Sequence, residues 1–384
     1  MIYLDHNATT APAPAAIDAM LAVLTDVWAN ASSQHGAGQQ AKRTLAAARA
    51  TIAGALGCKA REVVFTSGAT EANHLAVLGL GASATASAGR RRLVFGATEH
   101  AAQLKLAHAL AAQGRPVDFI AVRPDGVLDL DSAARVIGPD VALVSVMAAN
   151  NETGVLMPIT AVKALAQAAG ALLHVDATQL VGKLPFDFAA LGADAVSLSA
   201  HKLPGPKGIG ALLVRDGVPP AAPFPGSQER YRRGGTENLP AIVGFAAALE
   251  RLADVLADAA RIAALRDAFE AGLRAALPGV HVYGASAPRV PGTSCLRVGR
   301  LDADTVLQRC GQIGGCASSG PACSSGGSGP AHGLGAMGVP RDEAPGAVRF
   351  SRGAATSARD IDYLLAALPP LLKPLLAEAA VQPT

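Results

Sequence analysis

The sequence predicts an α/β fold in which a domain with a mostly parallel sheet is joined to a smaller α+β domain. Along the middle of the 384-residue chain, short β-rich runs alternate with Ala-rich helical stretches. These runs are apolar without strict alternation, which is typical of strands covered on both faces. From about Ala241 the character changes, and a long Ala- and Leu-rich helical pattern begins.

Seven runs are predicted to form the strands of the main sheet because they are short and rich in β-branched and other apolar residues. They are residues 62–66, 92–96, 116–122, 141–148, 171–176, 194–199 and 208–214. Helical patterns lie between several of them, for example over 160–169 after the turn-like NNETG. This order indicates strand–helix–strand units and hence a mostly parallel sheet.

The smaller domain is predicted from the C-terminal third of the chain. A helical pattern runs from about 241 to 277 and ends at Pro278-Gly279. The predicted elements that follow are strands at 280–284 and 293–299, a helix at 302–310, a strand at 347–351 and a last helix. A Gly/Ser-rich stretch from 311 to 329 surrounds Cys323, and its composition predicts a mobile loop.

Composition narrows the class of protein. Half of the residues are apolar and 16% are charged, as in an ordinary globular chain of roughly two domains. The net charge of +3 is too weak to indicate a nucleic-acid or membrane partner. No apolar run approaches the ~18 residues that span a bilayer, and Asp5 and His6 interrupt the N-terminus where a signal peptide would need an apolar stretch. Five cysteines are an odd number, so we expect reduced thiols and a cytoplasmic location.

Lys202 and Asp176 carry the first indication of chemistry. Asp176 ends a predicted strand, and Lys202 follows another strand and precedes a Gly/Pro-rich turn. In an open α/β sheet the carboxyl ends of the strands converge on the ligand crevice. A pyridoxal-phosphate enzyme needs a lysine for the Schiff base and an acid opposite the pyridinium nitrogen. The spacing fits these roles, although taken alone Lys202 also fits an ordinary surface lysine.

A phosphate site is predicted at SGATEAN (67–73), which follows a strand and enters a helical run. Backbone N–H groups and the helix dipole favour an anion at such a turn, although a hydroxyl there also fits a simple helix cap. Ser199 and His201 beside the lysine could add donors. His100 follows another strand and could stack on a ring, or be an ordinary polar residue.

Nine segments occur in the order found in the cysteine desulfurases, and the chain resembles that family from residue 3 to about residue 365. They are YLDHNATT (3–10), GATE (68–71), TEH (98–100), ANNETG (149–154), HVDATQ (174–179), SLSAHKLPGPKGIG (197–210), RRGGTEN (232–238), SSGPACSSG (318–326) and VRFS (348–351). The resemblance is to the group with a long Ser/Gly-rich catalytic loop, and it implies a pyridoxal-phosphate-dependent transferase of fold type I. We expect a large cofactor-binding domain at 15–255 and a small domain from 1–14 and 256–384, with the catalytic loop at 311–331.

The resemblance also implies roles for the residues that match these motifs. Lys202 resembles the Schiff-base lysine, Gln179 the partner of the ring's phenolic oxygen, and His100 the histidine that stacks on the ring and handles protons. Asn151 and Arg349 resemble the clamp on the substrate carboxylate, a task that suits the planar fork of Arg. The residues expected to bind the cofactor are Ala69, Thr70, His100, Asp176, Gln179, Ser199, His201, Lys202 and, from the second subunit of a homodimer, Thr236.

Cys323 resembles the catalytic nucleophile, and its Gly/Ser-rich surroundings would give a thiolate the reach that sulfur transfer needs. Cys295 lies in the apolar run TSCLRV and is expected to be a buried structural cysteine. The spacings of Cys310, Cys316 and Cys323 do not resemble a C-x-x-C zinc pattern. A transient metal or iron–sulfur cluster at Cys323 is a secondary expectation.

The implied activity is conversion of L-cysteine to L-alanine, with the sulfur left on Cys323 as a persulfide. An acceptor protein, such as an iron–sulfur scaffold or a tRNA-thiolation partner, would then take the sulfur. Three alternatives remain: a selenocysteine lyase, an aminotransferase (which would give the cysteine loop no purpose) and a non-catalytic iron–sulfur or zinc carrier. The segment at 225–235 matches the family's Gly-rich pattern only loosely, which bears on Thr236.

Overall fold

The main sheet has seven strands, and each of the seven predicted runs forms one of them. The computed structural model describes residues 1–218, 220–319 and 332–381. The strand order is β2-β8-β7-β6-β5-β3-β4. The bounds are β2 (Val63–Thr66), β3 (Arg92–Gly96), β4 (Val117–Ile120), β5 (Val141–Met147), β6 (Leu172–Asp176), β7 (Ala195–Ser199) and β8 (Gly210–Val214). Strands β3 to β7 pair in parallel and β8 is antiparallel to both its neighbours, so the prediction of a mostly parallel sheet is confirmed.

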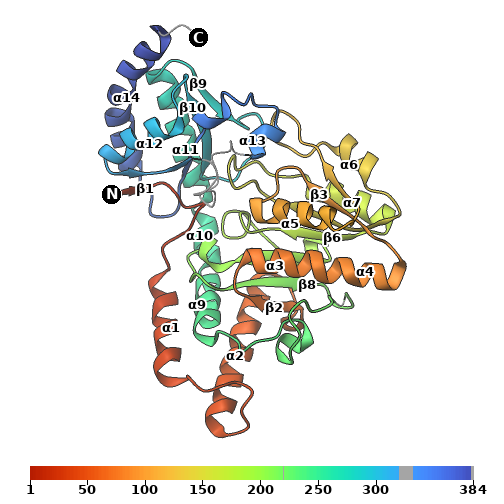
Figure 1. Ribbon diagram of the computed structural model, residues 1–384. Coiled ribbons are helices and arrows are strands. Elements are labelled where there is room, and N and C mark those ends of the chain that lie inside the picture. The colour runs from red at the N-terminus through yellow and green to blue at the C-terminus, as the bar shows by residue number, and fades with distance from the viewer. Residues whose placement is uncertain (219, 320–331, 382–384) are drawn as a thin grey trace.

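Helices cover both faces of this sheet (Figure 1). The helices on one face are α3 (Ala69–Leu75), η2 (Ala76–Leu80), α4 (Gly81–Ala88) and α5 (Ala101–Ala112). Those on the other face are α2 (Gly36–Ala55), α6 (Leu130–Val136), α7 (Ile159–Ala169), α8 (Phe188–Leu191) and α9 (Leu239–Glu250), with α1 (Pro14–Asp26) packed on α9. Short 3-10 turns lie at η1 (Ala60–Glu62), η3 (Ala200–Lys202) and η4 (Gln228–Tyr231).

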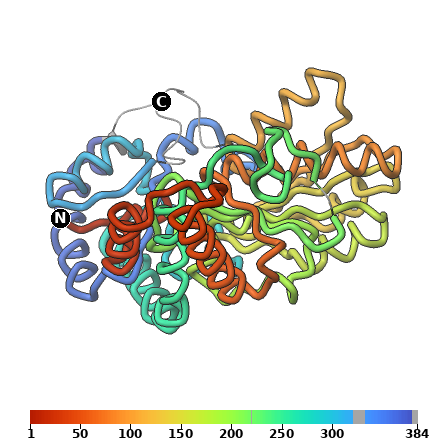
Figure 2. Tube along the Cα trace, turned by 90° about the horizontal axis from the view of Figure 1, so that it is seen from below, coloured from red at the N-terminus to blue at the C-terminus, as the bar shows by residue number. Residues whose placement is uncertain are grey.

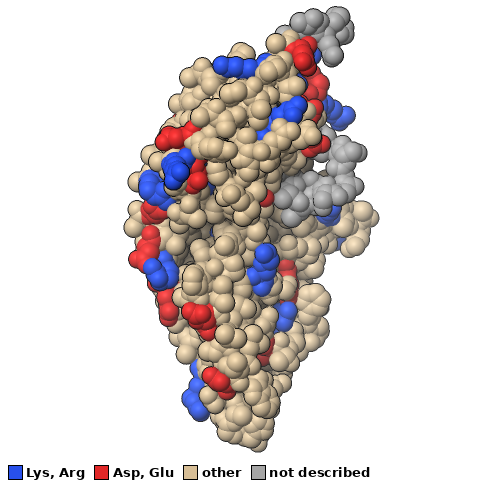
Figure 3. Space-filling view, turned by 90° about the vertical axis from the view of Figure 1, so that its left-hand side faces the viewer, with Lys and Arg blue, Asp and Glu red and all other residues tan. Residues whose placement is uncertain are grey.

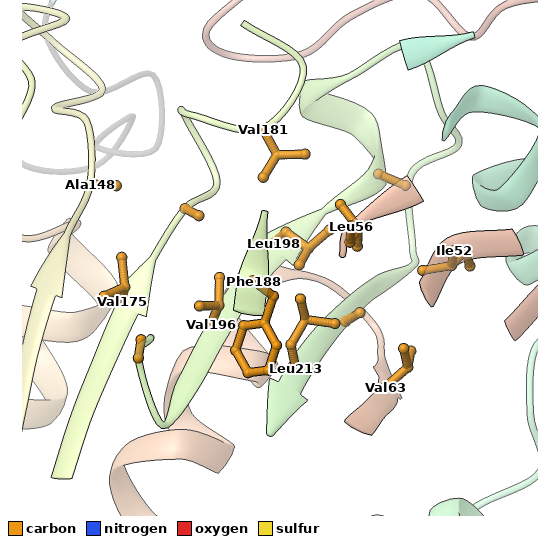
Figure 4. Close-up of a cluster of buried hydrophobic side chains, with 14 of the residues drawn as sticks. Ile52, Leu56, Val63, Ala148, Val175, Val181, Phe188, Val196, Leu198 and Leu213 are labelled. Atoms are coloured by element: carbon orange, nitrogen blue, oxygen red, sulfur yellow. The ribbon is translucent and has the colours of Figure 1, made fainter. Parts of the chain in front are cut away.

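The strands are apolar throughout because consecutive side chains enter different cores. On β2, Val63 belongs to the core under α2, whereas its neighbour Val64 belongs to the core under α3 and α4. Successive side chains of a strand point to opposite faces, so a sheet covered twice needs apolar residues at every position. Figure 4 shows the first of these cores, with Phe188 among side chains of α2, β7 and β8.

A second, four-stranded sheet lies in the C-terminal third, where the smaller domain is predicted. Its order is β12-β13-β10-β9, with antiparallel pairs throughout. The elements are β9 (Val280–Tyr283), β10 (Thr293–Val298), α12 (Ala303–Gln312), β12 (Ser318–Ser319), α13 (His332–Ala336), η5 (Ala344–Gly346), β13 (Val348–Ser351) and α14 (Ala358–Val381). Phe269, Leu296, Phe350 and Leu364 are buried in its core, together with Leu4 from the N-terminus.

The N-terminal segment forms a separate two-stranded sheet, bridges to β13 through Asp5 and Ser351, and then crosses to the main sheet. Strand β1 (Ile2–Tyr3) pairs in parallel with β11 (Gly315–Cys316). In the view from below, the N-terminus lies among the C-terminal elements, while the segments of the main sheet occupy the other half (Figure 2). The domain division drawn at residue 255 stays a prediction.

The helical pattern over 241–277 was expected to be continuous, and the structure shows three helices instead. They are α9, α10 (Leu252–Ala257) and α11 (Ala259–Ala276). The breaks fall at Arg251 (φ −93°, ψ 8°) and Asp258 (φ −85°, ψ −6°). The reason is that α9 packs against α1 and α2, whereas α11 packs against α14 and β9. A straight helix cannot follow both cores.

On the face drawn in Figure 3, acidic and basic side chains are interspersed. Within the described ranges, no helix is both long and apolar enough to cross a membrane.

Candidate active site

A cavity of about 440 Å³ lies at the carboxyl ends of the parallel strands. Asp176 at the end of β6 and Ser199 at the end of β7 line it, as does the segment that joins β2 to α3. The N-terminal segment supplies Asn7, Ala8 and Thr9 from the opposite side. The cavity therefore lies where an open α/β sheet is expected to bind its ligand.

Most of the predicted site residues meet in this one cavity. They are Ala69, Thr70, His100, Asn151, Asp176, Gln179, Ser199, His201, Lys202 and Arg349. Thr236 does not: it is exposed and lines a separate hollow beside Trp28. Cys323 lies outside the described residues. The roles assigned to these residues stay predictions, but their convergence is a property of the fold.

Lys202 ends the short turn η3 that follows β7, which directs it into the cavity. Its Nζ donates hydrogen bonds to the backbone oxygens of Asn7 (2.6 Å) and Ala8 (2.8 Å). The N-terminal segment therefore holds the amine at the base of the cavity.

Asp176 is buried, and its carboxylate is fixed by two donors. Oδ2 accepts from Asn73 Nδ2 at 2.7 Å, and Oδ1 accepts from the backbone N–H of Thr178 at 2.9 Å. Asn73 is the last residue of SGATEAN, yet no role was predicted for it. Its place in that motif was the signal that could have identified it.

Glu99 is a second buried carboxyl group beside Asp176, and sequence reasoning missed it. Its Oε1 accepts from the backbone N–H of Met147 at 2.7 Å. Burial raises the pKa of Glu99 well above its ordinary value, and the negative charge of Asp176 raises it further. The protonated form of Glu99 is therefore favoured relative to that of an exposed glutamate.

His100 caps the N-terminus of α5, where its Nδ1 accepts from the backbone N–H of Ala102 at 3.2 Å. Burial lowers the pKa of His100, and the charges of Lys202 and His332 add to this effect, whereas Asp176 opposes it. The imidazole is therefore neutral at pH 7, with its proton on Nε2. A neutral ring of this kind can stack on a planar ligand and exchange a proton.

Hydroxyl and imidazole groups gather where a phosphate is expected. Thr70, Ser199 and His201 line the same part of the chain's ligand cavity, with Lys207 close by. His201 Nδ1 lies 3.1 Å from Thr9 Oγ1. Burial lowers the pKa of His201 to about 4, and the two lysines contribute to the shift.

Arg349 on β13 is buried and already holds a carboxylate. Its Nη2 donates to Asp5 Oδ1 at 2.7 Å, and its Nη1 donates to the backbone oxygen of Asn151 at 3.0 Å. Asn151 thus contributes its carbonyl oxygen to this arginine. Asp5 was quoted within a motif, but its pairing with Arg349 was not predicted, because the two residues are 344 positions apart.

The donor set fits pyridoxal phosphate. One cavity holds an amine at Lys202, a fixed carboxylate at Asp176, and hydroxyl donors at Thr70 and Ser199. These match the aldehyde, the ring nitrogen and the phosphate of that cofactor. Within residues 1–218, 220–319 and 332–381, no three His, Cys, Asp or Glu side chains are grouped closely enough to hold an ion. The metal or cluster expected at Cys323 falls outside these ranges.

Three of the described cysteines have surroundings that disfavour a thiolate. Cys295 is buried on β10, as expected, and burial raises the pKa of its thiol. Burial also raises the pKa of Cys58 to about 12 and that of Cys310 to about 11. None of these three is therefore a ready thiolate.

Comparison with known proteins adds three findings. The model of the family Aminotransferase class-V matches residues 2–364. The chain is 43% identical over 379 residues to a cysteine desulfurase of Cereibacter sphaeroides, which covers 98% of this chain and 97% of the relative. A solved NifS-like protein superposes with a TM-score of 0.89 at 32% identity, covering 97% of this chain and 99% of the other. SspA in complex with cysteine superposes with a TM-score of 0.81 at 29% identity, covering 93% and 100%.

Proposed function

This chain belongs to the cysteine desulfurases of the class-V aminotransferase family, and from that premise we propose how its own residues perform the reaction. The family's cofactor is pyridoxal phosphate, which when bound withdraws electrons from the substrate and so labilises its bonds near Cα. The observation that carries the proposal is that Lys202, Asp176 and Arg349 line one cavity. L-cysteine is the proposed substrate, as in the complex of SspA with cysteine.

Lys202 would hold the cofactor and move the substrate's Cα proton. Asp176 would keep a proton on the ring nitrogen, and its contacts with Asn73 and the Thr178 N–H fix the carboxylate for that task. His100, which is half-buried, would stack on the ring. The residues that would hold the phosphate all line the cavity: Ala69, Thr70, Ser199 and His201.

Arg349 binds the substrate carboxylate. Its Nη2 now bonds to Asp5, so an incoming carboxylate takes up or shares a position that Asp5 holds. The backbone oxygen of Asn151 keeps the guanidinium oriented during this exchange. A bidentate arginine–carboxylate pair also sets the direction of the substrate's side chain.

Cys323 receives the sulfur. The Cβ–S bond of the substrate breaks, an S–S bond to the Cys323 thiolate forms, and alanine leaves. The raised pKa values of Cys58 and Cys310 make those two thiols poor nucleophiles at neutral pH, which agrees with their having no part in the proposed reaction. An acceptor protein, such as an iron–sulfur scaffold, then takes the sulfur in a reducing compartment such as the cytoplasm.

A homodimer completes the site. Ile17, Leu21 and Leu24 form an exposed apolar stripe on one face of α1, and Trp28 extends it with 80% of its surface exposed. Thr236 lies beside Trp28 and away from its own chain's cavity. A second copy that covers the stripe would receive Thr236 at its phosphate site. A holoenzyme that sediments as a monomer would contradict this.

The test is alanine and sulfide formation from L-cysteine by the holoenzyme, with a thiol reductant present. Cys323→Ser should abolish turnover and retain the bound yellow cofactor, whereas Cys58→Ser, the matched control, should keep activity. Full activity of Cys323→Ser would refute the role of Cys323. Retained activity of that variant on selenocysteine alone would favour the lyase alternative.

A further inference from the structure

Lys183 is a second lysine near the cofactor site, and the proposed reaction gives it no role. It lies in the turn after β6 and does not line the cavity. Its Nζ donates hydrogen bonds to two side-chain amide oxygens, Asn7 Oδ1 at 2.6 Å and Gln179 Oε1. Both of those residues do line the cavity.

Other hydrogen bonds identify which atom of each amide is the nitrogen and which is the oxygen. Gln179 Nε2 donates to the backbone oxygen of Asn7 at 2.9 Å. Asn7 Nδ2 donates to the backbone oxygen of Asn151 at 3.1 Å and to Thr293 Oγ1 at 2.9 Å. A backbone oxygen can only accept, so in each amide the nitrogen faces it and the oxygen faces Lys183.

Asn7 links Lys183 to Lys202. Its side-chain oxygen accepts from Lys183, and its backbone oxygen accepts from Lys202 at 2.6 Å. Asn7 is buried, with 2% of its surface exposed, so these bonds are shielded from water. A change at Lys183 therefore reaches the base of the cavity through a single residue.

The surroundings of Lys183 are otherwise basic. Burial lowers the pKa of Lys183 well below its ordinary value, and the charges of Lys202 and Arg349 lower it further. His6 also faces it, and burial and Lys183 together lower the pKa of His6 to about 4. The neighbouring cations Lys202 and Arg349 disfavour a positive charge on Lys183. The amide oxygens of Asn7 and Gln179 nevertheless accept hydrogen bonds from its amine and keep it in place.

We propose that Lys183 is a positioning residue of the cofactor site, which holds the Gln179 amide with its nitrogen toward the cavity and braces Asn7 beneath Lys202. An amide nitrogen carries two protons, and Asn7 uses one, which leaves the second for an acceptor in the cavity. The expected acceptor is the phenolic oxygen of the cofactor. The inference rests on the proposed role of Gln179.

The test is the pH titration of the Schiff-base absorbance in the holoenzyme. Without Lys183 the Gln179 amide can turn its oxygen to the cavity, and the hydrogen bond from the Lys183 amine to Asn7 is lost. Both changes favour a protonated Schiff base, so in Lys183→Met the titration midpoint should rise by about one pH unit. Lys183→Arg should keep a midpoint close to that of the wild type, and Lys42→Met, which changes an exposed lysine on α2, should not shift the midpoint.

A double-mutant cycle tests whether Lys183 acts through Gln179. Gln179→Ala should raise the midpoint by itself, and adding Lys183→Met should raise it little further, because coupled residues are non-additive. Additive shifts, or a wild-type midpoint in Lys183→Met, would overturn the inference. If Lys183→Met does not fold, Lys183→Gln should shift the midpoint in the same direction.

The outcomes separate this inference from the proposed function. A wild-type holoenzyme that forms alanine while Lys183→Met keeps the wild-type midpoint would refute only the positioning role. A wild-type protein without Schiff-base absorbance would instead refute the assigned cofactor chemistry of Lys202.

Discussion

At the scale of single residues, two adjacent buried carboxyl groups differ in the hydrogen-bond donors that surround them. Asp176 receives hydrogen bonds from Asn73 and from the Thr178 N–H, whereas Glu99 receives one, from Met147. Burial and the charge of Asp176 raise the pKa of Glu99, and its single donor opposes that shift only in part.

Glu99→Gln tests whether the pKa of Glu99 is raised in the folded protein. When the folded-state pKa of an acid is raised, the protein loses stability as pH rises above the acid's unfolded pKa of about 4.5, because only the unfolded chain then releases the proton. The variant has no such loss, so its stability relative to wild type should increase between about pH 5 and 7, on the order of 1 kcal/mol per pH unit. Urea unfolding of the apoprotein measures it. Parallel pH profiles for the two proteins would mean that Glu99 is ionised.

At the scale of elements, the turn η4 is strained and firmly anchored. Glu229, Arg230 and Tyr231 have φ values of 48°, 56° and 63°, in the left-handed region that non-glycine residues rarely occupy. Glu229 is held by Arg49 at 2.6 and 2.7 Å and by the Phe65 N–H at 3.0 Å. Strain of this kind persists where the surroundings impose it. The turn leads directly into the segment that carries Thr236.

Tyr231→Gly should stabilise the protein, by about 1 kcal/mol, because glycine adopts this conformation without a steric cost. The ring of Tyr231 is 76% exposed, so little buried surface is lost. Tyr363→Gly is the matched control, since Tyr363 is an exposed residue inside α14, and it should destabilise by roughly 1 kcal/mol. Thermal unfolding of both variants measures the two changes in stability. If Tyr231→Gly destabilises the protein as much as Tyr363→Gly does, the Tyr231 ring makes a stabilising contact.

At the scale of the molecule, the sequence predicts the strands and their direction because that information is local. Apolar runs such as 62–66 predict the strands directly, and the polar residues that follow such runs predict where the ligand cavity lies. The breaks at Arg251 and Asp258 were not predictable, because they depend on which core each helix meets. Lys183 and Glu99 were missed for the same reason, since their roles arise from neighbours that only the fold brings together.

Acid should destabilise the whole molecule through its buried histidines. Burial lowers the pKa of His6, His174 and His201 to about 4. Because unfolded histidine titrates near 6.5, their stabilising contribution is present above that pH and is lost as pH falls toward about 4. His174, between Ser145 and Ser197 at 2.8 Å each, is the most buried of the three. His174→Gln should flatten the slope of unfolding free energy against pH by about one proton in that interval; an unchanged slope would contradict it.

The bonds of Asn7 have a consequence for biosynthesis. Its backbone N–H donates to Ser351 Oγ, and its side chain donates to Thr293, so residues from the first and last parts of the chain meet at the base of the cavity. A nascent chain emerges from the ribosome in order, and the main sheet is available long before β13 has been made. The pocket beneath Lys202 is therefore completed only after residue 351 has left the ribosome, and before that point the cofactor meets an unfinished site.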